Sequence, residues 1–116
     1  MPQDPLTIED IAGPVDGQRI LRLAGPLLIN NLFSFQDKVR SDQSRQLILD
    51  FTGMPYIDSA GIGALVGAYV NRQKEGGRSL ALVGVNDRVL TSLKVTHVDQ
   101  FFRFYKNVEE IQQAVA

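Results

Sequence analysis

The residues with the clearest chemical potential stand together in Asp58-Ser59, a carboxylate followed by a hydroxyl at the expected start of a helix. Asp and Ser are both favoured N-cap residues, so one of the two must cap that helix. A phosphate on Ser59 would lie at the positive end of the helix dipole, at little cost to the fold. The pair therefore predicts a modification that changes a surface without unfolding the domain. It leaves open that Ser59 is only a helix cap.

The helix expected after this pair contains three glycines, at positions 61, 63 and 67. Glycine in a helix interior costs about 0.8–1 kcal/mol relative to alanine, so each of them needs a reason. For Gly67, close approach of the helix to the sheet or to a neighbouring helix explains the glycine as well as a partner would. For Gly61 and Gly63 we expect a partner's backbone to approach the first turn.

Several other chemistries lack the residues that they need. The segment Ile57–Gly61 has no first glycine of the G-x-S-x-G motif, and His97 is the only histidine that could act as a base for Ser59. The chain has no Cys, which excludes thiolate metal sites and Cys nucleophiles, and no Asp/Glu cluster has ligand spacing. Gly61-x-Gly63 is not a dinucleotide-binding fingerprint. We predict no catalysis, no cofactor and no metal.

Length and composition indicate a small domain without a strong charge. The 116 residues include 12 Lys+Arg and 13 Asp+Glu and are 44% hydrophobic, which predicts one domain, 1–116, with an ordered core over about 6–115. A net charge of −1 offers no basic field to nucleic acid or an anionic membrane. The start of the sequence shows no signal-peptide pattern, so we expect none, and no apolar run approaches the roughly 20 residues of a membrane helix. We expect a cytoplasmic protein that binds neither nucleic acid nor membrane.

Hydrophobic periodicity predicts the elements that position Asp58 and Ser59. The expected order is β-β-α-β-α-β-α-β-α, an α/β fold in one domain whose mixed β-sheet is packed with about four α-helices. The first two strands form a hairpin, and Gly25-Pro26 ends the second. The predicted strands are 6–11, 19–24, 46–51, 79–83 and 101–105, and the predicted helices are 29–40, 59–75, 86–95 and 108–115.

The apolar faces of the first two helices follow from the same spacing. The first face contains Ile29, Leu32, Phe33, Phe35 and Val39, and the second Ile62, Leu65, Val66, Tyr69 and Val70. Asp50, in the apolar strand before the site, is expected to be a hydrogen-bonded structural group, because a buried carboxylate needs partners. Asp58 and Ser59 follow that strand at its carboxyl end, where α/β sheets dock ligands and partners.

Leu49-Asp50-Phe51 followed by Met54–Gly63 resembles the signature of STAS domains, above all of bacterial anti-sigma factor antagonists. The resemblance covers nearly the whole chain in family order. It implies that Ser59 is a phosphoacceptor. The implied partner is an anti-sigma factor with serine kinase activity and a GHKL-type ATP site, which binds the unmodified protein and releases it after phosphorylation. A PP2C-type phosphatase would restore the unmodified form. The expected docking surface consists of Asp58, Ala60, Gly61 and Ile62, with Leu27 and Leu28 opposite.

One departure from the family pattern keeps two alternatives open. Members with this switch usually have Gly-Glu-Leu-Asp after the second strand, where this chain has Gly25-Pro26-Leu27-Leu28 and no acidic residue. Leu27 and Leu28 could supply apolar contact instead. The first alternative is a scaffold subunit of a stressosome-like assembly, in which the fold forms a homo-oligomer. The second is an accessory STAS module of a transport system.

Overall fold

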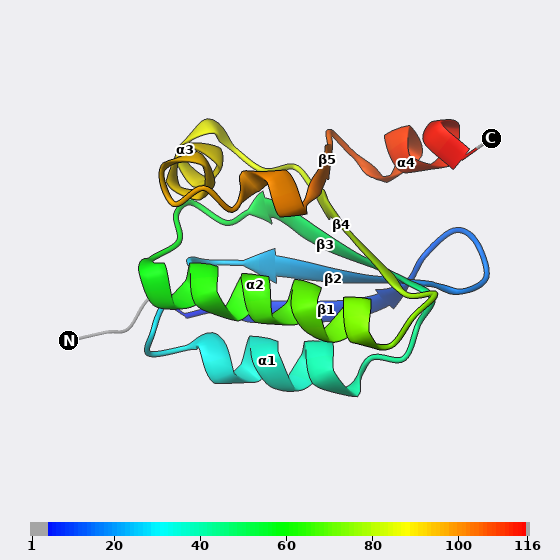
Figure 1. The fold of residues 1–116 in the computed structure, drawn as a ribbon, viewed down its shortest axis with the longest axis horizontal. Helices are drawn as coiled ribbons and strands as arrows, with labels where there is room; N and C mark the ends of the chain where they lie inside the picture. The colour runs from blue at the N-terminus through cyan, green and yellow to red at the C-terminus, as the bar shows by residue number, and fades with distance from the viewer. Residues whose placement is uncertain (1–4, 116) are drawn as a thin grey trace.

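The computed structural model describes residues 5–115, which form one five-stranded mixed sheet with helices on both faces (Figure 1). The strands follow one another across the sheet in chain order; β1 and β2 are antiparallel and every later pair is parallel. The expected α/β fold and order of elements are therefore confirmed. The strands are β1 Thr7–Ala12, β2 Gln18–Ala24, β3 Gln46–Gly53, β4 Ser79–Val83 and β5 Arg103–Tyr105. The helices are α1 Leu32–Ser41, α2 Ser59–Lys74, α3 Asp87–Val95 and α4 Val108–Val115, with a 3-10 helix η1 at Asp99–Phe101.

Alternation along the strands divides the apolar side chains between the two faces of the sheet. Leu47, Leu49 and Phe51 of β3 pack under α1, α2 and α3 in the larger core. Ile48 points the other way, into a smaller cluster that α4 covers through Ile111. The rest of that second face carries ion pairs across the strands, such as Arg22 with Asp50 at 3.4 Å. Asp50 also accepts a hydrogen bond from the Thr52 N–H, so its expected structural role is confirmed.

The first helix begins at Leu32, not at residue 29. Asn31 does not cap it with its side chain; its Oδ1 accepts from the Leu28 N–H and its Nδ2 donates to the Pro26 carbonyl. These bonds hold the preceding residues in a loop. Ile29 and Phe33, expected on the buried face, are consequently 64% and 68% exposed.

Two other details of the expected elements are wrong. Val70 is exposed, whereas the other expected residues of the α2 face, Ile62, Leu65, Val66 and Tyr69, do lie in or against the core. The buried face of α2 also includes Gly61, Ala64, Ala68 and Arg72. The aromatic strand starts at Arg103, because Phe101 belongs to η1. Phe101 contacts Tyr69 of α2 in a tilted arrangement and Phe102 contacts it edge to face, with ring centroids 5.5 and 5.7 Å away.

Arg72 fastens the end of α2 to two other segments. The residue is 3% exposed. Its Nε donates to the Ser79 carbonyl, Nη1 pairs with Asp42 at 3.1 Å, and Nη2 donates to the Ser44 carbonyl. Burial lowers the pKa of Arg72, and the Asp42 carboxylate opposes that shift. A cation in the last turn also suits the helix dipole. One guanidinium therefore ties α2 to the α1–β3 loop and to the start of β4.

Arg72→Ala should lower the free energy of unfolding by about 3–5 kcal/mol, because it leaves a nearly buried carboxylate and two carbonyls without their donor. Urea unfolding followed by circular dichroism measures the loss. The control is Arg40→Ala, since Arg40 is exposed and its ion pair with Asp37 is loose, at 4.0 Å. For this variant we expect the free energy of unfolding to change by no more than about 0.5 kcal/mol. Equal losses in the two variants would show that the buried network does not stabilise the fold.

Candidate functional site

Two loops at the carboxyl ends of β2 and β3 are joined backbone to backbone beside the start of α2. Leu27 and Ile57 form an isolated parallel bridge. The Leu27 N–H donates to the Tyr56 carbonyl at 3.4 Å, and the Asp58 N–H donates to the Leu27 carbonyl at 3.2 Å. The loop after β2 thereby extends the sheet toward the residues that begin α2.

A third loop supports the same region from the side of β4. Asn86 donates through Nδ2 to the Met54 carbonyl at 2.9 Å, and its Oδ1 accepts from the Val89 N–H as the cap of α3. The Arg88 guanidinium lies 4.8 Å from the centre of the Tyr56 ring. The segment before Asp58 is therefore held by neighbours on both sides.

Asp58 is the residue that caps α2. Its Oδ1 accepts from the Gly61 N–H at 2.8 Å, and its Oδ2 accepts from the Ile29 N–H at 3.0 Å. One carboxylate thus fixes the first turn of the helix and the β2–α1 loop together. The alternative that Ser59 is only a helix cap is wrong, because Asp58 performs that role.

Ser59 is the first residue of α2 and is exposed. Its hydroxyl makes no hydrogen bond to another residue within 5–115. A side chain at this position can be modified without breaking an internal contact, and a phosphate there would meet the positive end of the helix dipole. His97 is exposed in a turn after α3, with φ of 61°, and makes no hydrogen bond to Ser59.

The three glycines of α2 have different surroundings. A Cβ on Gly61 would lie 2.3 Å from the Leu27 carbonyl oxygen and 2.8 Å from Ile57 Cγ1. The chain's own backbone therefore explains Gly61, and the expectation that a partner explains it is wrong. Around Gly63 and Gly67, no atom within 4 Å of such a Cβ comes from outside the neighbouring backbone of α2 itself. Close packing inside the domain therefore does not explain Gly67, while the expected partner contact at Gly63 stays a prediction.

The structure divides the residues expected to contact a partner. Leu27, Gly61 and Ile62 are buried, so they contribute little to the surface that a partner can contact. Leu28, Asp58 and Ala60 are half-buried beside exposed Ser59.

Sequence reasoning missed Ile29 and Phe33 as surface residues, because it placed both of these exposed apolar side chains on a buried helix face. Ile29 is tied to Asp58 by its N–H, and Phe33 lies on the first turn of α1. The signal that could have found them is the pair Asn30-Asn31, because asparagine favours turns as well as helix caps.

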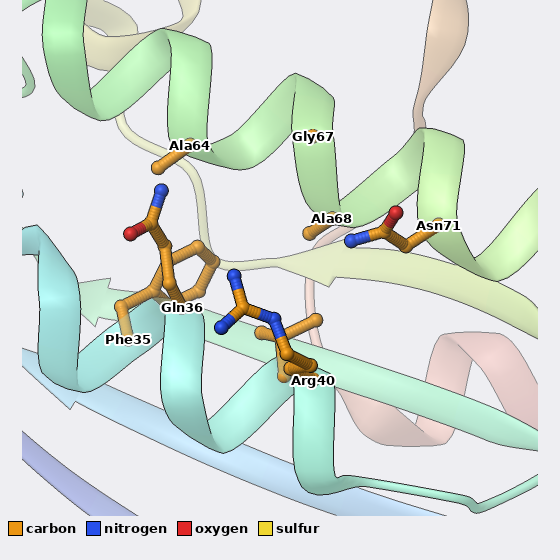
Figure 2. Close-up of a pocket in the computed structure, with 8 residues that line it drawn as sticks. Phe35, Gln36, Arg40, Ala64, Gly67, Ala68 and Asn71 are labelled. Atoms are coloured by element: carbon orange, nitrogen blue, oxygen red, sulfur yellow. The ribbon is translucent and has the colours of Figure 1, made fainter.

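The gap between α1 and α2 is too small to be a ligand site. Figure 2 shows Gln36 and Arg40 pointing from α1 toward α2, and Asn71 pointing from α2 into the space between the two helices. The cavity there has a volume of about 50 Å³, enough for a few water molecules. Among the described residues, no three His, Asp or Glu side chains gather as metal ligands. Within the same residues, no helix is long and apolar enough to cross a membrane.

Comparison with known proteins identifies a family and a set of similar folds. The family model described as STAS domain matches residues 9–111. An anti-sigma factor antagonist from Mycobacterium paratuberculosis is 18% identical with a TM-score of 0.77, and the match covers 94% of each chain. The anti-sigma factor antagonist SpoIIAA in its unphosphorylated form is 15% identical with a TM-score of 0.72, over 96% of each chain. The Bacillus cell fate determinant SpoIIAA in the phosphorylated form is 14% identical with a TM-score of 0.67.

A similar fold also occurs inside a much larger protein. The murine solute carrier 26 family member A9, an anion transporter, is 19% identical with a TM-score of 0.75. The match covers 97% of this chain but only 22% of the transporter. At such identities the likeness to each of these structures shows the fold alone.

Substituting alanine at two neighbouring glycines should have opposite effects on stability. Gly61→Ala forces a Cβ against the Leu27 carbonyl and should cost about 1–3 kcal/mol. Gly63→Ala meets open space in a helix interior and should stabilise by about 0.8–1 kcal/mol. Urea unfolding of both variants beside the wild type measures the difference. If Gly61→Ala were as stable as Gly63→Ala, the contact between Leu27 and α2 would not constrain the site.

Proposed function

The chain belongs to the STAS domain family, and on that premise we propose that it is an anti-sigma factor antagonist switched by phosphorylation of Ser59. Its partner is an anti-sigma factor with serine kinase activity, which binds the unmodified protein in the cytoplasm and releases it after modification. A PP2C-type phosphatase reverses the change, and the protein itself is not an enzyme. The observation that carries the proposal is the exposed Ser59 hydroxyl beside the fixed carboxylate of Asp58.

The charges around Ser59 supply the physical basis of the switch. Phosphorylation adds about −1.5 to −2 charges next to the Asp58 carboxylate. That carboxylate is bonded to the N–H groups of Gly61 and Ile29, so it is held where it is. A partner surface complementary to the neutral hydroxyl would meet both negative groups. A coupling of about 3 kcal/mol between modification and binding changes affinity more than a hundredfold.

The proposed docking face consists of Leu28, Ile29, Phe33, Ala60 and Gly63, around Ser59. Ile29 and Phe33 supply large exposed apolar side chains of the kind that anchors interfaces. Gly63 leaves open space over α2, which lets a partner's backbone come close. Because the β2–α1 loop has no acidic residue, this face contacts its partner through apolar groups, and Ser59 supplies the polar contact that phosphorylation changes.

The fold likeness to an anion transporter supports a second candidate function, an accessory STAS module of a transport system. In that role the docking face would contact a membrane protein, and Ser59 would not need to be modified. In a scaffold subunit of a stressosome-like assembly, Ser59 would likewise not need to be modified. Phosphorylation at Ser59 therefore separates the proposed function from both alternatives.

The proposal predicts phosphoserine at position 59 in protein purified from the cells that produce it. Intact mass followed by peptide mapping should find one phosphate, on Ser59, in a fraction that changes with growth conditions. The matched control is Ser59→Ala expressed in the same cells, which should lack the phosphate. Complete absence of phosphate across exponential growth, starvation and stress would contradict the switch and favour the other two functions.

Substitutions at Ser59 should separate binding from folding. Because the hydroxyl makes no internal hydrogen bond, Ser59→Ala should unfold within about 0.5 kcal/mol of the wild type and keep its affinity for the anti-sigma factor. Ser59→Asp imitates part of the phosphate charge and should bind at least tenfold more weakly. Calorimetric titration with the anti-sigma factor captured by the Ser59→Ala protein measures both affinities. Equal affinities in the two variants would count against a phosphorylation switch.

A further inference from the structure

The two neighbouring strands β4 and β5 send the chain to opposite faces of the sheet. After β4 the chain enters α3, whose Val89 and Leu93 lie in the core shared with α1 and α2. After β5 it enters α4, whose Ile111 packs on the other face. Adjacent parallel strands with connections on opposite faces leave a crevice beyond their carboxyl ends, which is the usual place for a ligand in an α/β sheet. Figure 1 shows β5 between α3 and α4.

A hollow of about 640 Å³ occupies this switch point. That volume falls in the range of small-molecule sites, about 300–1,000 Å³. Its apolar walls are Val85, Leu90, Phe104 and Tyr105, all of them half-buried. Since no residue of the docking face lines it, this switch-point pocket is separate from the site around Ser59.

The rim of the switch-point pocket contains two ammonium groups that form no ion pair with the carboxylates beside them. Lys94 and Lys106 line it, and neither ammonium forms an ion pair or hydrogen bond with another residue within 5–115. Of the two acidic residues there, Glu110 accepts from the Lys106 N–H at 3.2 Å while its own N–H donates to Asn107. Both bonds belong to the start of α4, where they hold the Glu110 carboxylate against the backbone of Lys106. Asp99 is the other carboxylate of the rim, and within residues 5–115 it forms no ion pair with Lys94 or Lys106.

From this arrangement we infer that the switch-point pocket binds an amphipathic carboxylate. The aliphatic body of the ligand covers the apolar walls, chiefly Leu90 and Phe104, and its carboxylate lies between Lys94 and Lys106. Burial of the ligand's aliphatic part supplies hydrophobic free energy. The ammonium groups favour an anion over a neutral molecule of the same length. Binding does not require Ser59, so the inference stands apart from the phosphorylation switch.

Calorimetric titration of the full chain with octanoate, below its micelle concentration, tests the inference. We expect saturable binding of one octanoate per chain, with octanol, acetate and inorganic phosphate each at least tenfold weaker. Equal binding of octanol would remove the role of the lysines, and equal binding of acetate or phosphate would remove the role of the apolar walls. Either result, or no saturable binding of octanoate at millimolar concentration, overturns the inference.

Variants locate the binding in the pocket. Lys94→Gln with Lys106→Gln should weaken octanoate binding at least tenfold, and both side chains are exposed, so the unfolding midpoint should not move. The matched control is Lys38→Gln with Lys74→Gln, which removes the same charge from α1 and α2 and should leave the affinity unchanged. Ser59→Ala should also bind as the wild type does. Undiminished binding by the Lys94/Lys106 variant would place the ligand elsewhere and overturn the proposed site.

Discussion

The arrangement of the site depends on the two hydrogen bonds that the Asp58 carboxylate accepts. One oxygen caps α2 at the Gly61 N–H, and the other accepts from the Ile29 N–H of the β2–α1 loop. The absence of a side chain at Gly61 lets the Leu27 carbonyl approach the helix, so the two bonds can form at once. The proposed phosphoacceptor therefore stands on a turn that is fixed from two directions. A charge added there acts on a surface that is already in place.

The other end of α2 is also held by hydrogen bonds to neighbouring segments, so the helix is fixed at both ends. Arg72 bonds to Asp42, Ser44 and Ser79, so the last turns cannot move without breaking a buried network. An acidic cap at the first turn and a cation near the last both agree with the helix dipole. Fixed at both ends, α2 can keep an open face at Gly63 and Gly67, where glycine would otherwise loosen a helix.

Local patterns predicted the parts of this fold that local physics decides. The bounds of α4 and β4 were correct and those of α2 were off by one residue, because periodicity and flanking glycines determine them. The predicted start of α1 was wrong because the Asn31 side chain bonds to the backbone of Pro26 and Leu28. Hydrophobic periodicity contains no information about these loop hydrogen bonds. The reason for glycine at position 61 could not be predicted either, because the atom that a side chain there would meet belongs to Leu27, a residue far away in the sequence. The switch-point pocket was not predicted at all, because it depends on which face each helix covers.

The apolar β2–α1 loop changes how a phosphate at Ser59 would act. Here Pro26 and Leu27 are buried, Leu28 is half-buried and Ile29 is exposed, so the loop gives the docking face no acidic charge of its own. A partner that covers such a face must also remove water from whatever group stands at position 59. A hydroxyl loses little by this, whereas a phosphate dianion taken out of water without a cationic partner is costly. On this chain, desolvation of the phosphate adds to repulsion by Asp58, and an apolar loop strengthens the contrast between the two states.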